Sequence, residues 1–234
     1  MIIEDLVQRS PLRILEKSIH GGLGKGNIGV LASRKGVGKT ACLVHIATDK
    51  LFQKKPVIHV SYSSRVDHII NWYEDIYKEL SRGMDAEPAA DLHDELVRKR
   101  VIMNFNQEGT RTEQVLRSLE AMIRDGRFAA DTVIVDGFSF PQSSPADLGN
   151  FKGFAGRMEL ELWFSASLKG PEPLFDEQGV PEELKGCLDP IDVLITLRPW
   201  NNRVQLRLIK DHGWSSPPDL RLSLDPTTLL IAEP

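Results

Sequence analysis

Short apolar runs alternate along the chain with longer amphipathic stretches, and this alternation limits the possible folds more than any other feature of the sequence. The runs expected as strands are Asn27–Ala32, Val57–Ser61, Val101–Asn106, Thr132–Asp136 and Leu160–Leu168. Apolar residues at helical spacing predict helices over Lys39–Leu51, Arg65–Leu80, Thr112–Asp125 and a stretch after Pro145. Strands that alternate with helices form a parallel sheet covered on both faces, so the sequence predicts an α/β fold.

The last third of the chain has a different pattern. The runs Ile191–Leu197, Arg203–Ile209 and Thr228–Ile231 look like strands separated by turn residues, which predicts an antiparallel meander at one edge of the sheet. Two stretches rich in Gly, Pro or small residues are expected outside the regular elements. Residues 81–91 should form a loop, and residues 170–190 a surface loop or lid.

Composition indicates one compact domain. The chain has 234 residues, of which 41% are hydrophobic and 26% charged, which is enough apolar material for one large core. We therefore expect a single domain over residues 1–234, with residues 1–26 leading into the first strand. The net charge of −4 argues against broad electrostatic binding to nucleic acid, although it leaves room for a local basic path.

The cysteines and the N-terminal residues indicate the compartment. Cys42 and Cys187 are far apart and form no CxxC pair, so neither a zinc site nor a disulfide framework is expected. The N-terminal residues carry acids and a proline where a secretory signal would be apolar. No apolar run approaches the ~18 residues that span a bilayer. We expect a cytoplasmic protein without a membrane partner.

A glycine-bearing turn directly after the first apolar run carries the strongest chemical signal. A bound phosphate chain needs converging backbone N–H groups, a helix N-terminus and a positive charge. Gly36 and Gly38 allow the tight turn, Lys39 would reach the β- and γ-phosphates, and the Thr40 hydroxyl would bind Mg²⁺. The expected nucleotide-binding residues are Ser33, Arg34, Lys35, Gly36, Val37, Gly38, Lys39, Thr40 and Ala41.

This turn departs from the Walker A pattern at Ser33, where the pattern has glycine; an incidental Gly-rich turn is the alternative. Asp136 closes the apolar run Thr132–Asp136, where an acid would complete the Mg²⁺ site together with Thr40. The alternative for Asp136 is a strand cap that begins a turn. No Asn-Lys-x-Asp motif for guanine is present, which favours ATP.

With these residues the chain resembles the RecA-like P-loop superfamily, in particular its KaiC-like ATPases and DnaB-type helicase domains. The resemblance extends from about Leu15 to Ile231 and includes LEKSIHGGLGKG before the first strand. It implies a three-layer RecA-like domain that binds ATP and Mg²⁺ and assembles into rings or filaments. It also implies that Lys210 and His212 act in trans on a neighbour's nucleotide, and that Ser165 and Ser167 sense the γ-phosphate.

Two departures from the family affect catalysis. The family places a catalytic Glu just after the second strand, where this chain has Ser61-Tyr62-Ser63-Ser64. The family's Lys-x-Arg pair appears as Lys210 and His212, which weakens the trans-acting charge. A serine hydroxyl is no general base at neutral pH without an activating partner. We therefore expect nucleotide binding with slow or absent hydrolysis, in a regulatory or assembly switch.

Three alternatives stay open. The chain can be an active ATPase of DNA recombination or replication that uses Asp67 or Glu108 as base. It can be a pseudoenzyme scaffold that binds no nucleotide. It can also be a MinD-like ATPase, because Arg34 stands where those proteins carry a signature lysine in the phosphate loop.

The expected partners are ATP and either another protein or a second copy of the chain. Trp200 and Trp214, with the nearby arginines at 198, 203 and 207, would form a protein- or nucleic-acid-binding surface.

Overall fold

The computed structural model describes residues 2–63, 65, 67–140, 144–170, 173–213 and 219–233. Within them, nine strands form one sheet. The strands are Ile28–Arg34 (β1), Val57–Ser61 (β2), Arg100–Asn104 (β3), Thr132–Asp136 (β4), Glu161–Leu168 (β5), Val193–Trp200 (β6), Arg203–Asp211 (β7), Leu222–Leu224 (β8) and Ile231–Ala232 (β9). Their order is β3-β2-β4-β5-β1-β6-β7-β8-β9. From β3 through β2, β4, β5 and β1 to β6, neighbouring strands are parallel. From β6 through β7 and β8 to β9, they are antiparallel. The predicted α/β class, with a mostly parallel sheet and C-terminal antiparallel strands, is confirmed.

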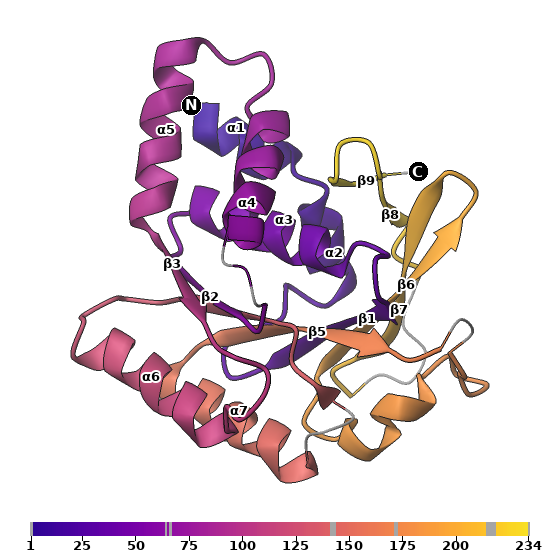
Figure 1. The fold of residues 1–234 in the computed structure, drawn as a ribbon. Coiled ribbons are helices and arrows are strands. Elements are labelled where there is room, and N and C mark those ends of the chain that lie inside the picture. The colour runs from indigo at the N-terminus through magenta and orange to yellow at the C-terminus, as the bar shows by residue number, and fades with distance from the viewer. Residues whose placement is uncertain are drawn as a thin grey trace.

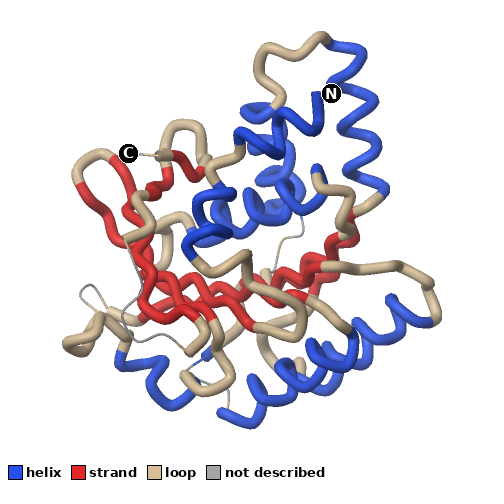
Figure 2. The backbone as a smooth tube through the Cα atoms, turned by 180° about the vertical axis from the view of Figure 1, so that it is seen from behind, coloured by secondary structure: helices blue, strands red, loops and turns tan. Residues whose placement is uncertain are grey.

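Helices cover both faces of this sheet (Figure 1; Figure 2 shows the same layers from behind). One face carries Ile2–Arg9 (α1), Leu12–Ser18 (α2), Lys39–Phe52 (α3), Asp67–Leu80 (α4) and Ala86–Arg98 (α5). The other carries Thr112–Arg124 (α6), Pro145–Met158 (α7) and the 3₁₀ helix Glu182–Cys187 (η2). Each helical layer buries its own apolar cluster against the sheet.

The sequence explains the central elements well. Strand β4 is buried along Thr132–Val135 and emerges only at Asp136, as expected for a strand covered on both faces. Helix α7 begins with Ser144 and Asp147 in a capping box and has Pro145 at its first position. Helix α3 is buried almost throughout, because it lies between the sheet and the other helices of its layer.

The expected loop over residues 81–91 is wrong in its second half, because α5 begins at Ala86. Pro88 had indicated a break, but a proline in the first helical turn removes no hydrogen bond that the helix needs. Leu92 and Leu96, one turn apart, are buried on the inner face of the helix. Burial of this apolar face stabilises the helix here.

The expected surface loop or lid over residues 170–190 also needs correction. Over its described residues 173–190 the segment includes η2, and Val180, Leu184 and Cys187 are buried in the core beside α7. Apolar side chains between the prolines anchor it to the sheet, so its second half is part of the packed layer. Leu174 alone of its large apolar residues is strongly exposed.

The C-terminal strands differ in detail from the expected Thr228–Ile231. The last strand is Ile231–Ala232, Thr228 lies in the preceding turn, and Leu222–Leu224 forms the strand before that turn. Trp214 lies outside the described residues. In the described part of the chain, no helix combines the length and apolarity needed to cross a membrane.

Candidate functional site

The glycine-bearing turn lies where β1 ends and α3 begins, at the edge of the sheet to which the parallel strands point their carboxyl ends. Ser33 and Arg34 end β1, residues 35–38 form the turn, and Lys39 to Ala41 begin α3. Strand β5 lies between β1 and β4. Asp136, the last residue of β4, is therefore only two strands away from the strand that leads into the turn. In parallel sheets with helices on both faces, this edge is the usual place for ligands.

The backbone of the turn can accept an anion. Gly36 and Gly38 have φ angles of 83° and 117°, in the region that glycine adopts without strain. Gly38 is the N-cap residue of α3, and it has no side chain that could accept a hydrogen bond from the first turn of the helix. The first N–H groups of a helix lack intrahelical partners and carry the positive end of the helix dipole. The N-terminus of α3 is therefore suited to phosphate.

Lys39 is folded back over this turn. Its Nζ donates hydrogen bonds to the carbonyl oxygens of Ser33 at 3.0 Å and Arg34 at 2.9 Å. Only 7% of Lys39 is exposed, and burial lowers its pKa to about 8 although Asp136 acts in the opposite direction. Its Nζ also donates a hydrogen bond to Ser33 Oγ at 3.4 Å. The amine thus sits beside the helix N-terminus and is bonded to neutral groups, which an anion can replace.

Asp136 joins the turn to the strands beside it. Thr40 Oγ1 donates a hydrogen bond to its Oδ2 at 2.8 Å, and Ser165 Oγ donates one to its Oδ1 at 2.6 Å. The N–H of Gly137 donates to Ser165 Oγ at 2.9 Å. Ser165 lies on β5, the strand between β4 and β1. The hydroxyl and carboxylate predicted to hold a metal ion are therefore in direct contact.

These groups suit a Mg²⁺ ion that takes its remaining ligands from water and phosphate. They are too few to hold a metal ion by protein ligands alone. They offer hard oxygen ligands, one carboxylate and two hydroxyls, as Mg²⁺ prefers. In the residues described, no cluster of three or more His, Cys, Asp or Glu side chains could hold a metal. Mg²⁺ commonly keeps several waters and shares its ligands with phosphates. Thr40 and Asp136 could hold it in that way once a nucleotide is bound.

The stretch after β2 supplies no carboxylate to this site. Ser61 Oγ accepts a hydrogen bond from Ser63 N–H, and the Tyr62 N–H donates to the Asp136 carbonyl oxygen. Ser64 lies outside the described residues. Asp67 is exposed and bonded to Arg65, and Glu108 is exposed in the turn after β3. Of the described side chains, those of Thr40 and Ser165 hydrogen-bond to Asp136; Asp67 and Glu108 do not.

A buried polar cluster lies behind this stretch and was not recognised in the sequence. His59 on β2 is fully buried, and its Nδ1 is 3.1 Å from the Tyr73 hydroxyl on α4. The Arg100 guanidinium lies 4.1 Å from the centre of the Tyr73 ring. Burial lowers the pKa of His59 to about 4, although Asp136 opposes this shift. His59 is thus neutral near pH 7. A lone histidine in an apolar strand gives no sequence signal for such a cluster.

The C-terminal strands also contact the turn, which no local pattern indicated. Leu224 of β8 packs over Gly38: a Cβ built on Gly38 would lie 2.2 Å from Leu224 Cδ2. The Ile231 N–H of β9 donates a hydrogen bond to His45 Nδ1 on α3 at 2.9 Å. The N-terminal half of α3 is therefore bound directly to the last two strands.

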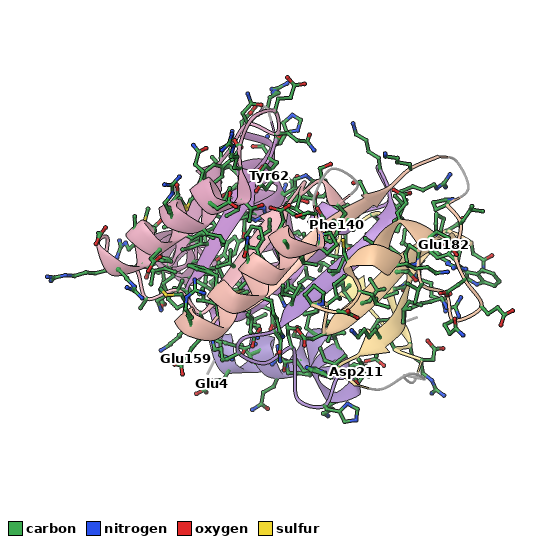
Figure 3. The ribbon with its side chains drawn as sticks, turned by 90° about the horizontal axis from the view of Figure 1, so that it is seen from below. Glu4, Tyr62, Phe140, Glu159, Glu182 and Asp211 are labelled. Atoms are coloured by element: carbon green, nitrogen blue, oxygen red, sulfur yellow. The ribbon has the colours of Figure 1, made fainter. Side chains whose placement is uncertain are left out.

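Lys210 and His212 are not brought to the turn of their own chain. Asp211, between them, pairs with Val193 at the start of β6. Val193 in turn pairs with Gly29 near the start of β1, so this region lies at the opposite edge of the sheet. Figure 3 shows the same separation, with Tyr62 near one edge and Asp211 near the other.

Both side chains have partners at that edge. Lys210 Nζ donates a hydrogen bond to the Leu188 carbonyl oxygen at 2.9 Å, and burial lowers its pKa. The His212 ring nitrogens lie 2.7 Å from Asp211 Oδ1 and 3.1 Å from the Leu23 carbonyl oxygen. Action on a nucleotide would require a second copy of the chain and the loss of these contacts, so their trans-acting role stays a prediction.

The close contact at Gly38 predicts a large effect of adding a methyl group there. We expect Gly38→Ala to lower the free energy of unfolding by about 2–4 kcal/mol, from backbone strain at positive φ and overpacking against Leu224. Urea unfolding followed by circular dichroism measures this change.

Gly36→Ala is the matched control. Gly36 also has a positive φ, but a Cβ there would meet nothing within 4 Å. It should cost only the backbone strain, about 1–2 kcal/mol. Leu224→Ala should relieve part of the Gly38→Ala defect in the double variant. Equal losses for the two glycine variants would contradict the proposed contact.

A scan against protein-family models finds no match to this chain. A search of curated proteins likewise finds no significantly similar sequence. A function for the chain is therefore inferred from the geometry of these residues.

Proposed function

We propose that the chain is a RecA-like P-loop protein that binds ATP with Mg²⁺ and acts as a nucleotide-dependent regulatory or assembly switch, with slow or absent hydrolysis. The turn would hold the phosphates through its backbone N–H groups and Lys39. Thr40 and Asp136 would hold the metal ion. The mostly parallel sheet with antiparallel C-terminal strands is compatible with the RecA-like class.

One observation carries this proposal: Thr40 Oγ1 lies 2.8 Å from Asp136 Oδ2 at the uncapped N-terminus of α3. The two residues are 96 positions apart in the sequence. An incidental glycine turn would have no reason to meet a carboxylate at the end of a buried strand. A phosphate site that uses Mg²⁺ needs both groups together.

The proposal of slow or absent hydrolysis has a separate basis. An attacking water needs a base within hydrogen-bond reach. The described residues just after β2 offer hydroxyl groups instead, and Asp67 is bonded to Arg65 at the surface. When bound, Mg²⁺ would supply positive charge for the phosphates, but it would not supply this base.

A switch also needs a route from the nucleotide to the rest of the molecule. Leu224 packs on Gly38, and Ile231 is hydrogen-bonded to His45 of α3. A change in the turn on nucleotide binding would act directly on β8 and β9. These strands lie at the end of the sheet, where they can present the change to a partner.

Titration of the chain with a fluorescent ATP analogue, with and without Mg²⁺, tests the proposal. We expect saturable binding that Mg²⁺ strengthens, and turnover far below that of an active ATPase. No binding at millimolar analogue would refute the proposal and favour the nucleotide-free scaffold. Turnover of several per second, stimulated by DNA and lost in Thr40→Ala, would favour the active ATPase instead.

The lowered pKa of Lys39 predicts a pH dependence of nucleotide binding. Phosphate binds the ammonium form, so binding raises the pKa of Lys39 from its value of about 8 in the free protein. The contribution of the ammonium group is fully present well below pH 8 and declines as the pH rises through 8. We expect the association constant to be level up to about pH 7.5 and to fall by as much as about tenfold per pH unit above about pH 8.

Lys39→Arg is the control for this profile. Arginine keeps its charge throughout this range, so the fall above pH 8 should disappear even if the affinity is lower. A wild-type profile that stays level to pH 9.5 would contradict the role of Lys39.

A further inference from the structure

The Ser165 hydroxyl holds one oxygen of the Asp136 carboxylate, and Thr40 holds the other. Ser165 Oγ lies 2.6 Å from Asp136 Oδ1, and Thr40 Oγ1 lies 2.8 Å from Oδ2. Val135 pairs with Phe164 in the parallel register of β4 with β5. The residues that come next, Asp136 and Ser165, are therefore neighbours across the two strands. The contact thus follows from the register of the sheet.

The direction of each hydrogen bond at Ser165 is fixed by its partners. The backbone N–H of Gly137 can only donate, and it donates to Ser165 Oγ at 2.9 Å. An ionised carboxylate can only accept, so the Ser165 O–H donates to Asp136. The distance of 2.6 Å between these two oxygens is typical of a charge-assisted O–H···O⁻ bond. The single proton of the hydroxyl is therefore already used.

A serine with its proton used in this way is poorly suited to sense the γ-phosphate. A sensor has to donate a hydrogen bond to phosphate oxygens, and serine has one proton to donate. Ser165 is also only 2% exposed, so contact with a nucleotide would require it to leave both Asp136 and Gly137. The geometry favours a different role for this residue from the one that the resemblance implies.

The backbone on both sides of the Asp136 carboxylate is held in place. The Tyr62 N–H donates to the Asp136 carbonyl oxygen at 2.9 Å. Gly137 has a φ of 89°, and a Cβ built there would lie 3.3 Å from Tyr62 Cβ, so the chain after Asp136 is closely packed. Rotation of the Asp136 side chain then decides where its oxygens point, and the two hydroxyls limit that rotation.

We propose that Ser165 is a positioning residue of the metal site, whose hydroxyl fixes the Asp136 carboxylate in the orientation that holds Mg²⁺ together with Thr40. This inference rests on the proposed function, since it requires a metal ion at Asp136. Mg²⁺ demands near-ideal geometry of its ligands, so its binding depends on where the carboxylate points. Loss of a group that hydrogen-bonds to a metal ligand commonly weakens metal binding by about 10–100-fold.

A matched pair of substitutions isolates the hydroxyl. Ser165→Thr keeps the O–H group, whereas Ser165→Val has nearly the same shape without it, so any cost of packing a larger side chain is shared. The quantity measured is the Mg²⁺ ratio, the affinity for the fluorescent ATP analogue with Mg²⁺ divided by the affinity in EDTA. We expect this ratio to be about tenfold lower in Ser165→Val than in Ser165→Thr. The affinities in EDTA should agree within about twofold, because no metal is then bound.

A fluorescent ADP analogue separates orientation of the carboxylate from sensing of the γ-phosphate. A positioning residue acts through the metal ion, so the Mg²⁺ ratio should fall for both nucleotides. A sensor of the γ-phosphate would affect the ATP analogue alone. A loss in Ser165→Val that is confined to the ATP analogue would therefore overturn the positioning role.

Thr48→Val is the control for loss of a buried hydroxyl near the turn. Thr48 is 1% exposed on α3, and its Oγ1 donates to the Val44 carbonyl oxygen at 2.8 Å. This substitution should leave the Mg²⁺ ratio within about twofold of wild type, since the hydroxyl is bonded within the helix and away from Asp136. A drop equal to that of Ser165→Val would mean that general loosening of the fold lowers the ratio, and would overturn the proposal.

Hydrogen exchange of the Gly137 N–H tests the same contact without nucleotide. This amide is bonded to the Ser165 hydroxyl oxygen, which Ser165→Thr keeps and Ser165→Val removes. We expect exchange at least about fivefold faster in Ser165→Val than in Ser165→Thr. Equal exchange rates in the pair would contradict an anchoring hydroxyl at this position.

The two proposals fail in different ways. A wild-type chain that binds neither nucleotide analogue, with or without Mg²⁺, refutes the proposed function and the metal role of Ser165 with it. Nucleotide binding that Mg²⁺ strengthens, with equal Mg²⁺ ratios in Ser165→Thr and Ser165→Val, supports the proposed function and refutes the positioning role alone.

Discussion

Lys39→Ala is expected to weaken binding of the ATP analogue by about 100-fold or more, or about 3 kcal/mol, because it removes the cation at the uncapped N-terminus of α3. Among the described residues this amine is bonded to neutral groups, the carbonyl oxygens of Ser33 and Arg34 and the Ser33 hydroxyl. Its loss should therefore affect the ligand far more than the fold. The affinity is measured by fluorescence titration at pH 7, and the free energy of unfolding by urea denaturation.

Lys35→Ala is the matched control, since Lys35 lies in the same turn, its side chain is exposed, and the substitution keeps the backbone N–H through which the turn would hold the phosphates. It should change the affinity by less than about threefold, as expected for an exposed charge screened by water. Equal effects of the two variants would mean that general charge, and not a placed amine, attracts the nucleotide. An unchanged affinity in Lys39→Ala would refute the proposed phosphate site.

Ser63→Glu is expected to raise ATP turnover by about 100-fold or more, because it places a general base just after β2. Ser63 is two residues after Ser61, and Ser61 pairs with Asp136 in the register of β2 with β4. It is half-buried and makes hydrogen bonds only within residues 61–65 among the described contacts. Steady-state release of phosphate, at saturating ATP and Mg²⁺, measures the change.

Ser63→Gln separates a base from a longer side chain. Glutamine has the same shape as glutamate but accepts no proton at neutral pH, so it should leave turnover at the wild-type level. A similar gain in both variants would indicate an effect on the position of the segment. If Ser63→Glu binds the nucleotide normally but turnover does not rise, then the lack of a carboxylate at this position is not the reason for slow hydrolysis.

Several corrections share one physical cause: burial overrides local propensity. Pro88 suggested a loop, but α5 begins at Ala86 because Leu92 and Leu96 are covered by neighbouring elements. The prolines of residues 170–190 suggested a surface lid, but Leu184 is fully buried in η2. Propensity describes what a segment prefers in isolation, whereas its surroundings decide whether its apolar side chains leave water.

The sequence by itself determined the α/β class and the candidate phosphate turn. Both depend on residues that are consecutive in the chain: alternating apolar runs define the layers, and Gly36, Gly38, Lys39 and Thr40 lie within one turn. Their backbone angles and helix position are properties of the local chain. Such features can therefore be read without knowledge of distant contacts.

Only the tertiary structure decided which distant residues meet this turn. The strand order brings Asp136 to Thr40 and to Ser165, and places Leu224 on Gly38. The antiparallel direction of β7 places Lys210 at the opposite edge. These neighbours depend on pairings between strands far apart in the sequence, whose register is set by burial of whole faces of the sheet and not by any local pattern.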